Sequence, residues 1–281
     1  MTTPVPRTLY IHDDLSEELR GRDEHAQQVG AALFERLHGD ARIVVLTLDE
    51  QLDALVARGR HAPFTAAVGI GRAGRRVAAQ VHARTGWFPR IHAVDLWREE
   101  DEAGDYVLAG SAALASRLAE IADVDSVAVV DDTIFSGLTM RAVLEALPVQ
   151  SGRRVHAFCL RAVADSLTSV AAMAPVSAGV AAAGRILEDV SFINASGLVH
   201  RGAIRRSERA SLAFFERPEW MEAWFPGYAE EIVKLCRELH EVVEAPPANP
   251  APRMRRGSGA PSARPGSRPP GSSSRRSAPG R

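Results

Sequence analysis

Short apolar runs alternate with amphipathic segments over most of the chain. The apolar runs predict strands at 42–48, 65–70, 90–96, 127–130, 154–161 and 177–181. Apolar residues spaced three and four apart predict helices at 14–38, 50–58, 76–83, 111–121, 140–147 and 164–173. Strands that alternate with helices in this way are typical of α/β proteins. We therefore predict an open, mainly parallel sheet flanked by helices.

The pattern changes after residue 184. Residues 185–227 carry a basic cluster and then a group of aromatic side chains: Arg201, Arg205, Arg206 and Arg209, followed by Phe214, Phe215, Trp220, Trp224 and Phe225. We expect these aromatic residues to belong to the core. Residues 228–244 have the spacing of one amphipathic helix. We therefore divide the folded chain into a core with an N-terminal helix at 1–184 and a small C-terminal helical region at 185–245.

The last segment, 246–281, has a composition of its own. It contains eight arginines and no acidic residue, with much Pro, Gly and Ser. Because it has almost no apolar residues, it cannot bury a core, and we predict a disordered tail. The whole chain has 34 basic and 35 acidic residues, so without the tail 26 basic residues face 35 acidic ones and the charge is −9. An acidic body is unfavourable for contact with a phosphate backbone, so we do not expect a nucleic acid as the partner.

Other features of the composition exclude several classes of protein. With 46% hydrophobic residues, the 281-residue chain can build a full core. No apolar run has transmembrane length, and residues 1–7 lack the apolar core of a signal peptide, so we expect a cytoplasmic protein without a membrane partner. Two cysteines, Cys159 and Cys236, exclude a disulfide scaffold. The chain also lacks the Gly-x4-Gly-Lys-Ser/Thr motif of a phosphate-loop NTPase.

The segment 126–140 is the most informative about function. Its apolar run Val127–Val130 predicts a buried strand, and Asp131 and Asp132 follow at the carboxyl end of that strand. A loop of small and hydroxyl residues, Thr133–Thr139, comes next and leads into a helix. Ligands of open α/β sheets bind at the carboxyl ends of strands, and a loop of N–H groups that opens a helix binds anions. Because two carboxylates suit a vicinal diol, these parts together predict a sugar phosphate as the ligand.

Val127–Thr139 resembles the phosphoribosyl pyrophosphate signature of the type I phosphoribosyltransferases. That signature is four apolar residues, two acids, three variable residues, Ser/Thr-Gly, one variable residue and Thr, and every position is met. The resemblance implies that Asp131 and Asp132 are catalytic and bind the ribose hydroxyls. It also implies a binding loop for the 5′-phosphate, made of Thr133, Ile134, Phe135, Ser136, Gly137, Leu138 and Thr139.

The resemblance extends to a cofactor and to a second loop. Magnesium in this family bridges pyrophosphate and ribose, so most of its ligands are substrate and water, with Asp131 and Asp132 acting through water. A short Gly/Arg turn after the strand 65–70 resembles the family's pyrophosphate-binding loop: Gly71, Arg72, Ala73 and Gly74. Glycines permit unusual backbone angles there, and an arginine binds an anion with two parallel hydrogen bonds.

Type I enzymes also have a mobile loop, which the resemblance places at about 95–108. Arg98 in this segment is then a candidate to contact pyrophosphate. A solvated acidic hairpin is an equally good interpretation of the polar run 98–105. A variable hood binds the acceptor in this family, and the resemblance assigns it to 185–227. It also implies a homodimer.

The acceptor is constrained by two departures from the family's patterns. The 6-oxopurine enzymes have an Asp as general base where this chain has Phe135, and the orotate enzymes use a lysine, which is absent from 95–108. We therefore expect an enzyme of nucleotide or secondary metabolism that modifies a nitrogen or hydroxyl of a small molecule, either a non-standard base or a cationic metabolite such as an aminocyclitol. The acids at Glu99–Glu102 motivate the cationic choice. The alternative is a regulator of the same fold that senses phosphoribosyl pyrophosphate or nucleotides and binds nucleic acid.

Overall fold

The computed structural model describes residues 5–58, 63–102, 105–207 and 209–244. The predicted tail at 246–281 lies outside the described residues. None of the described helices is both long and apolar enough to cross a membrane.

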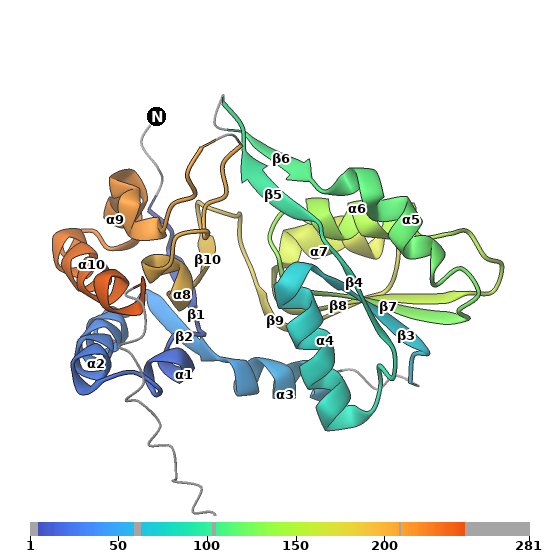
Figure 1. Cartoon of the computed structure of the whole chain (residues 1–281), viewed down its shortest axis with the longest axis horizontal. Helices are drawn as coiled ribbons and strands as arrows, with labels where there is room; N and C mark the ends of the chain where they lie inside the picture. Colours follow the sequence, from blue (N-terminus) through green and yellow to red (C-terminus); the bar gives the residue numbers. More distant parts are fainter. Residues whose placement is uncertain (1–4, 59–62, 103–104, 208, 245–281) are drawn as a thin grey trace, which may run out of the picture. The chain divides into compact units, whose positions relative to one another are not determined.

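A five-stranded sheet forms the main part of the fold (Figure 1). Its order is β4-β3-β7-β8-β9, and all neighbouring strands are parallel. The strands are β3 (Ala66–Ile70), β4 (Ile91–Val94), β7 (Ser126–Ile134), β8 (Arg154–Val163) and β9 (Val176–Ala182). These are the strands that the apolar runs predict. The α/β class is therefore confirmed.

Helices cover both faces of this sheet. One face packs against α5 (Leu114–Ala119), which follows η1 (Ser111–Ala113), and against α6 (Leu138–Ala146) and α7 (Ala164–Ala171). The other face packs against α3 (Leu48–Arg58) and α4 (Gly71–Thr85) (Figure 1). Val127 and Val129 of β7 belong to the first of these cores, and Ala128 and Val130 to the second. This alternation places successive side chains on opposite faces, which explains why the strand is apolar throughout.

A second parallel sheet has the order β10-β1-β2. Its strands are β1 (Thr8–Asp13), β2 (Ile43–Thr47) and β10 (Val190–Asn194). The sequence pattern predicts β2 but neither β1 nor β10. A third hydrophobic core joins this sheet to the helices α1 (Ser16–Leu19), α2 (Glu24–His38), α8 (Ala195–Val199), α9 (Pro218–Trp224) and α10 (Ala229–Glu244) and to η2 (Phe214–Glu216).

The prediction of one continuous helix over 14–38 is wrong. The chain forms α1, breaks, and begins α2 after Asp23, whose side chain accepts a hydrogen bond from the backbone N–H of Ala26 at 2.9 Å. A carboxylate at this capping position favours the start of a new helix over continuation of the old one. The helix predicted at 228–244 is confirmed as α10, and Phe215, Trp224 and Phe225 are buried, as expected for core aromatics.

In the segment predicted as the mobile loop, β5 (Trp97–Glu100) and β6 (Tyr106–Ala109) pair as an antiparallel ribbon. This pairing is compatible with a hairpin and does not test whether the segment moves. The backbone N–H of Glu100 donates to Arg205 O at 2.9 Å, and the N–H of Ser207 donates back to Glu100 O at 2.9 Å. The Glu100 carboxylate also pairs with Arg217. The ribbon is therefore attached to the region after residue 200.

Candidate functional site

Asp131 and Asp132 lie on β7 and not after it, because the strand continues to Ile134. Asp131 is in register with Cys159 of β8, and Thr133 with Arg161. The backbone N–H of Asp132 donates to Asp131 Oδ1 at 2.8 Å, and Thr133 Oγ1 donates to Asp132 Oδ2 at 3.2 Å. The two carboxyls are thereby held side by side at the carboxyl end of the sheet.

The two carboxyls have opposite pKa shifts. Burial, and then the negative charge of Asp132, raise the pKa of Asp131 well above its usual range. Burial also acts to raise the pKa of Asp132. The positive charge of Arg161 and hydrogen bonds from Asp131 and Thr133 together outweigh this effect, so the pKa of Asp132 is lowered. Asp132 is therefore the stronger acid of the pair, and Asp131 is the weaker one.

The segment predicted as a loop at 133–139 is shorter in the structure. Thr133 and Ile134 are part of β7, Phe135–Gly137 form the connection, and Leu138 and Thr139 begin α6. Gly137 has φ +75°, a left-handed conformation that favours glycine. The first N–H groups of a helix have no partner within it, so the start of α6 presents donors beside the acid pair.

Two side chains hold this connection in place. Ser166 Oγ donates to the backbone oxygen of Phe135. Arg141, in the first turn of α6, donates from Nη1 to Ser169 Oγ at 2.9 Å and to the backbone oxygen of Ser136 at 3.4 Å. Arg141 adds a positive charge to the N–H groups at the start of α6, and the sequence analysis did not identify it.

The predicted pyrophosphate loop is not a loop, because α4 begins at Gly71. Gly71 has φ +59°, and Gly74 is buried against β7, where an added Cβ would lie 2.3 Å from Val130 O and 3.1 Å from Asp131 Cα. Glycine at 74 therefore lets the first turn of α4 approach the acid pair. Ala73 is half-buried, and Arg72 is exposed. The arginine of α4 that the structure brings into the site is Arg76, which lies 3.5 Å from His12.

Arg98 of β5 is close to the predicted phosphate loop. Its guanidinium carbon lies 5.6 Å from the centre of the Phe135 ring. Its positive charge also acts on Asp131, where it opposes the rise in pKa that burial causes. The structure therefore brings Arg98 close to the acid pair and to the connection before α6.

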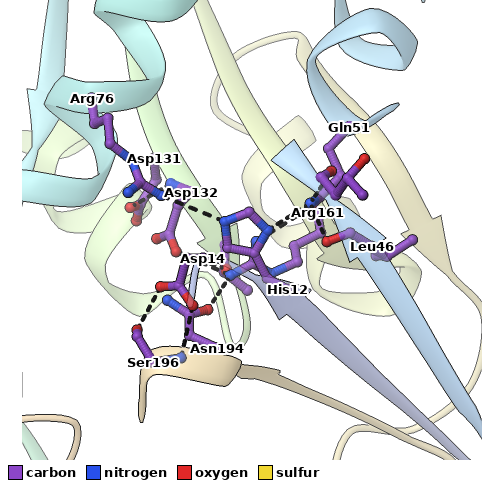
Figure 2. Close-up of polar contacts among 12 residues, drawn as sticks. His12, Asp14, Leu46, Gln51, Arg76, Asp131, Asp132, Arg161, Asn194 and Ser196 are labelled. Atoms are coloured by element: carbon purple, nitrogen blue, oxygen red, sulfur yellow. Dashed lines mark hydrogen bonds and ion pairs between the residues drawn. The ribbon is translucent and has the colours of Figure 1, made fainter. Parts of the chain in front are cut away.

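Arg161 of β8 is the residue that the sequence analysis missed and that the structure places at the centre (Figure 2). Its side chain is 1% exposed. Nη2 lies 3.2 Å from Asp132 Oδ2 and also donates to Asn194 Oδ1, and Nη1 donates to Gln51 Oε1 at 3.2 Å. One feature of the sequence could have identified Arg161: it directly follows the apolar run 155–160, on the strand that pairs with the strand of the two acids.

His12 of β1 lies in the same polar group. Gln51 Nε2 lies 2.8 Å from His12 Nδ1, and the ring is 2% exposed. Burial, followed by the charge of Arg161, lowers the pKa of His12 to about 4. Asp14 follows the same strand and accepts from the backbone N–H and the Oγ of Ser196 at 2.8 and 2.6 Å. Because β1 was not predicted, neither His12 nor Asp14 was identified from the sequence.

The donor set suits a hard cation that takes most of its ligands from substrate. Within the described part of the chain, no group of three or more His, Cys, Asp or Glu side chains could hold a metal ion by itself. Asp131 and Asp132 provide carboxylate oxygens, the ligand type that magnesium prefers, and magnesium usually keeps several waters and substrate phosphates. The residues present therefore fit magnesium bound together with a phosphate ligand.

Comparisons with known proteins give a fold-level likeness only. No protein-family model matches the chain, and no curated protein matches it. Similar solved structures include a purine phosphoribosyltransferase from Pyrococcus horikoshii Ot3, with 16% identity over 52% of this chain and 86% of that one and a TM-score of 0.33. An orotate phosphoribosyltransferase from Aeropyrum pernix has 20% identity over 52% and 75% of the two chains and a TM-score of 0.32. A hypothetical protein from Neisseria gonorrhoeae with bound ppGpp has 17% identity over 52% and 85%, with a TM-score of 0.37.

Proposed function

We propose that the protein is a magnesium-dependent phosphoribosyltransferase. It transfers the 5-phosphoribosyl group from phosphoribosyl pyrophosphate to a nitrogen or hydroxyl of a small acceptor and releases pyrophosphate. The observation that carries this proposal is the Asp131–Asp132 pair at the carboxyl end of β7, followed directly by the Gly137 turn that opens α6. This arrangement offers acceptors for two ribose hydroxyls next to donors for a phosphate.

Each part of the donor molecule has a counterpart in the site. The ribose hydroxyls donate hydrogen bonds to the carboxyl oxygens of Asp131 and Asp132. The 5′-phosphate accepts from the N–H groups of residues 135–139 and from the hydroxyls of Ser136 and Thr139, with Arg141 nearby. Because a phosphate carries negative charge, the N-terminus of α6 and a positive side chain both favour it.

The reaction exchanges one bond at the anomeric carbon for another. The bond from C1 to the pyrophosphate oxygen breaks, and pyrophosphate leaves with the electron pair. A lone pair on the acceptor nitrogen or oxygen forms the new bond to C1, and the proton of the acceptor passes to solvent or a neighbouring base. No atom is oxidised or reduced. The charge of Arg98 acts on Asp131, which supports its assignment as the side chain that stabilises the departing anion. Bound magnesium, held by Asp131 and Asp132 through water, would supply further positive charge for the pyrophosphate.

The choice of acceptor is the finer part of the proposal. The acids that motivated a cationic acceptor are partly engaged within the protein, because Glu100 pairs with Arg217 and Glu99 accepts from Trp97 Nε1 at 3.2 Å. Non-standard bases and cationic aminocyclitols both belong in a panel of acceptors. Direct use of water as an acceptor would appear as slow hydrolysis.

The experiment follows phosphoribosyl pyrophosphate with magnesium by ³¹P NMR, with and without the acceptor panel. We expect the wild type to release pyrophosphate and Asp131→Asn/Asp132→Asn to release none. Asp123→Asn/Asp125→Asn is the control, since it makes the same two substitutions at exposed positions near the opposite end of β7. Neither transfer nor hydrolysis by the wild type would contradict an enzyme and favour the alternative regulator.

A further inference from the structure

The side-chain amide of Gln51 has only one orientation that satisfies its neighbours. Arg161 Nη1 lies 3.2 Å from Oε1, and an arginine can only donate, so that atom must be the amide oxygen. Nε2 lies 2.8 Å from the backbone oxygen of Thr47, which can only accept, so that atom must be the NH2 group. Both contacts therefore fix the same assignment of the amide.

This assignment fixes the tautomer of His12. Gln51 Nε2 lies 2.8 Å from His12 Nδ1 and 3.5 Å from Leu46 O, so the ring nitrogen is the nearer acceptor for its second hydrogen. Nδ1 must then be the acceptor, because a hydrogen there would face the hydrogen of the amide. A neutral imidazole with an unprotonated Nδ1 carries its hydrogen on Nε2. The relay from Arg161 through Gln51 therefore turns Nε2 of His12 into a donor.

The guanidinium of Arg76, which can only donate hydrogen bonds, lies next to that donor. Its Nη2 lies 3.5 Å from His12 Nε2, the contact that Figure 2 marks with a dashed line. Because an arginine can only donate, this contact is a hydrogen bond only when Nε2 is an acceptor, and with the hydrogen on Nε2 that Gln51 requires, neither atom satisfies the other. His12 is 2% exposed, and in the part of the chain that the structure describes its Nε2 has no acceptor. With this tautomer, two donors lie 3.5 Å apart, one on a buried ring and one on the guanidinium of an exposed residue.

The acids in the neighbourhood accept hydrogen bonds from other donors. Asp14 accepts from Ser196 with both oxygens, at 2.8 and 2.6 Å. Asp132 Oδ2 accepts from Arg161 and Thr133 at 3.2 Å each. The positive charges of Arg76 and Arg161 offset the negative charges of Asp14 and Asp132 around His12.

We propose that His12 Nε2–H and Arg76 form an oxyanion subsite, which binds one anionic oxygen of a substrate beside the acid pair. Two sources supply such an oxygen: the pyrophosphate group of the donor, or a carboxylate on the acceptor. The subsite rests on the proposed function only for its place next to the ribose site. It adds a residue of the second sheet to the substrate contacts, since His12 lies on β1.

The first measurement is the ¹⁵N spectrum of the His12 ring in the full chain. We expect the Nε2–H tautomer at pH 7, and a shift of the Nε2 signal when an anion binds. Magnesium pyrophosphate and sodium acetate are titrated separately. A shift with pyrophosphate assigns the subsite to the donor, and a shift with acetate assigns it to a carboxylate of the acceptor. A hydrogen on Nδ1, or no shift with either anion, overturns the proposal.

The second measurement compares the affinities of variants for the anion that shifts the His12 signal. Arg76→Met and His12→Asn are expected to weaken its binding about tenfold, because each removes one hydrogen bond to a charged oxygen. His12→Gln, which can keep a donor near the position of Nε2, is expected to retain more affinity than His12→Asn. Arg84→Met is the control, since it removes the same charge from α4 where the arginine pairs with Asp49 and Asp53. Equal binding by Arg76→Met and the wild type would contradict the subsite.

Phosphoribosyl pyrophosphate binding separates this inference from the proposed function. If the wild type does not bind that compound but an anion still shifts His12, the proposed function is wrong and the subsite remains. If the wild type binds it and His12 does not respond to any anion, the subsite is wrong and the proposed function remains.

Discussion

The Arg161 guanidinium lies 3.2 Å from the carboxylate of Asp132, on the neighbouring strand of the main sheet. The arginine is 1% exposed and the aspartate side chain 23% exposed. The same guanidinium reaches Asn194 of β10, so one buried charge ties the acid pair to the second sheet. This ion pair gives Asp132 a structural role that Asp131, its neighbour, does not share.

Loss of Asp132 should therefore destabilise the protein. Asp132→Asn leaves the Arg161 charge buried without its counter-ion, which typically costs about 3–5 kcal/mol. Because the Asn194 and Gln51 contacts remain, we expect a value near the lower end of that range. Urea unfolding at pH 7 in EDTA measures the change, with Asp123→Asn as control. A loss no larger than that of the control would show that the pair does not stabilise the fold.

Loss of Asp131 should have the opposite effect. Its pKa is raised in the folded protein, so the native state holds a proton more tightly than the unfolded chain does, and stability falls as pH rises from about 4 through the folded pKa. We expect Asp131→Asn to unfold at a higher temperature than the wild type at pH 7 and to lose this advantage near pH 4. Thermal unfolding in EDTA across pH 4–8 checks it. A lower melting temperature than the wild type at pH 7 would contradict the assignment.

Gly74 should be required for the close approach of α4 to β7. In Gly74→Ala the new Cβ would lie 2.3 Å from Val130 O, so the helix must shift away from the acid pair. We expect a loss of about 1–3 kcal/mol, typical of overpacking, and weaker binding of phosphoribosyl pyrophosphate. Gly21→Ala is the control, because its nearest atom would be 3.8 Å away. Equal stability of the two variants would show that α4 can relax without cost.

Arg141 should contribute to phosphate binding. It lies in the first turn of α6 and contacts the backbone of the Phe135–Gly137 connection. Arg141→Met is expected to weaken binding of ribose 5-phosphate about tenfold, because a charge-assisted hydrogen bond or a close ion pair is lost. Calorimetric titration measures this, and Arg90→Met removes an exposed charge elsewhere as a control. Unchanged affinity would place the 5′-phosphate away from this turn.

The sequence predicts those parts of the fold that depend on local patterns. Val127–Val130 are buried on both faces of the sheet, so the strand is a continuous apolar run, and its acids mark the carboxyl end. The helix α10 has one apolar face, and its spacing predicts it closely. In both cases the residues that decide the structure are neighbours along the chain.

The missed parts depend on contacts between distant segments. β1 and β10 pair with each other although they are far apart in the sequence, and β1 ends in polar residues that resemble a loop. Arg161 is compatible with a strand only because Asp132, Asn194 and Gln51 surround it. The turn at Gly71–Gly74 suggested a loop because glycines are common there, whereas at Gly74 the glycine serves close packing of a helix.

The most direct test of the central claim is isothermal titration of phosphoribosyl pyrophosphate with magnesium into the wild type and into Asp131→Asn/Asp132→Asn. The control is Asp123→Asn/Asp125→Asn, and circular dichroism at the titration temperature verifies that each variant is folded. We predict magnesium-dependent binding by the wild type and the control, and loss of binding by the acid-pair variant. Binding that survives in a folded acid-pair variant, or its absence in the wild type, would contradict a phosphoribosyl pyrophosphate site at the carboxyl end of β7.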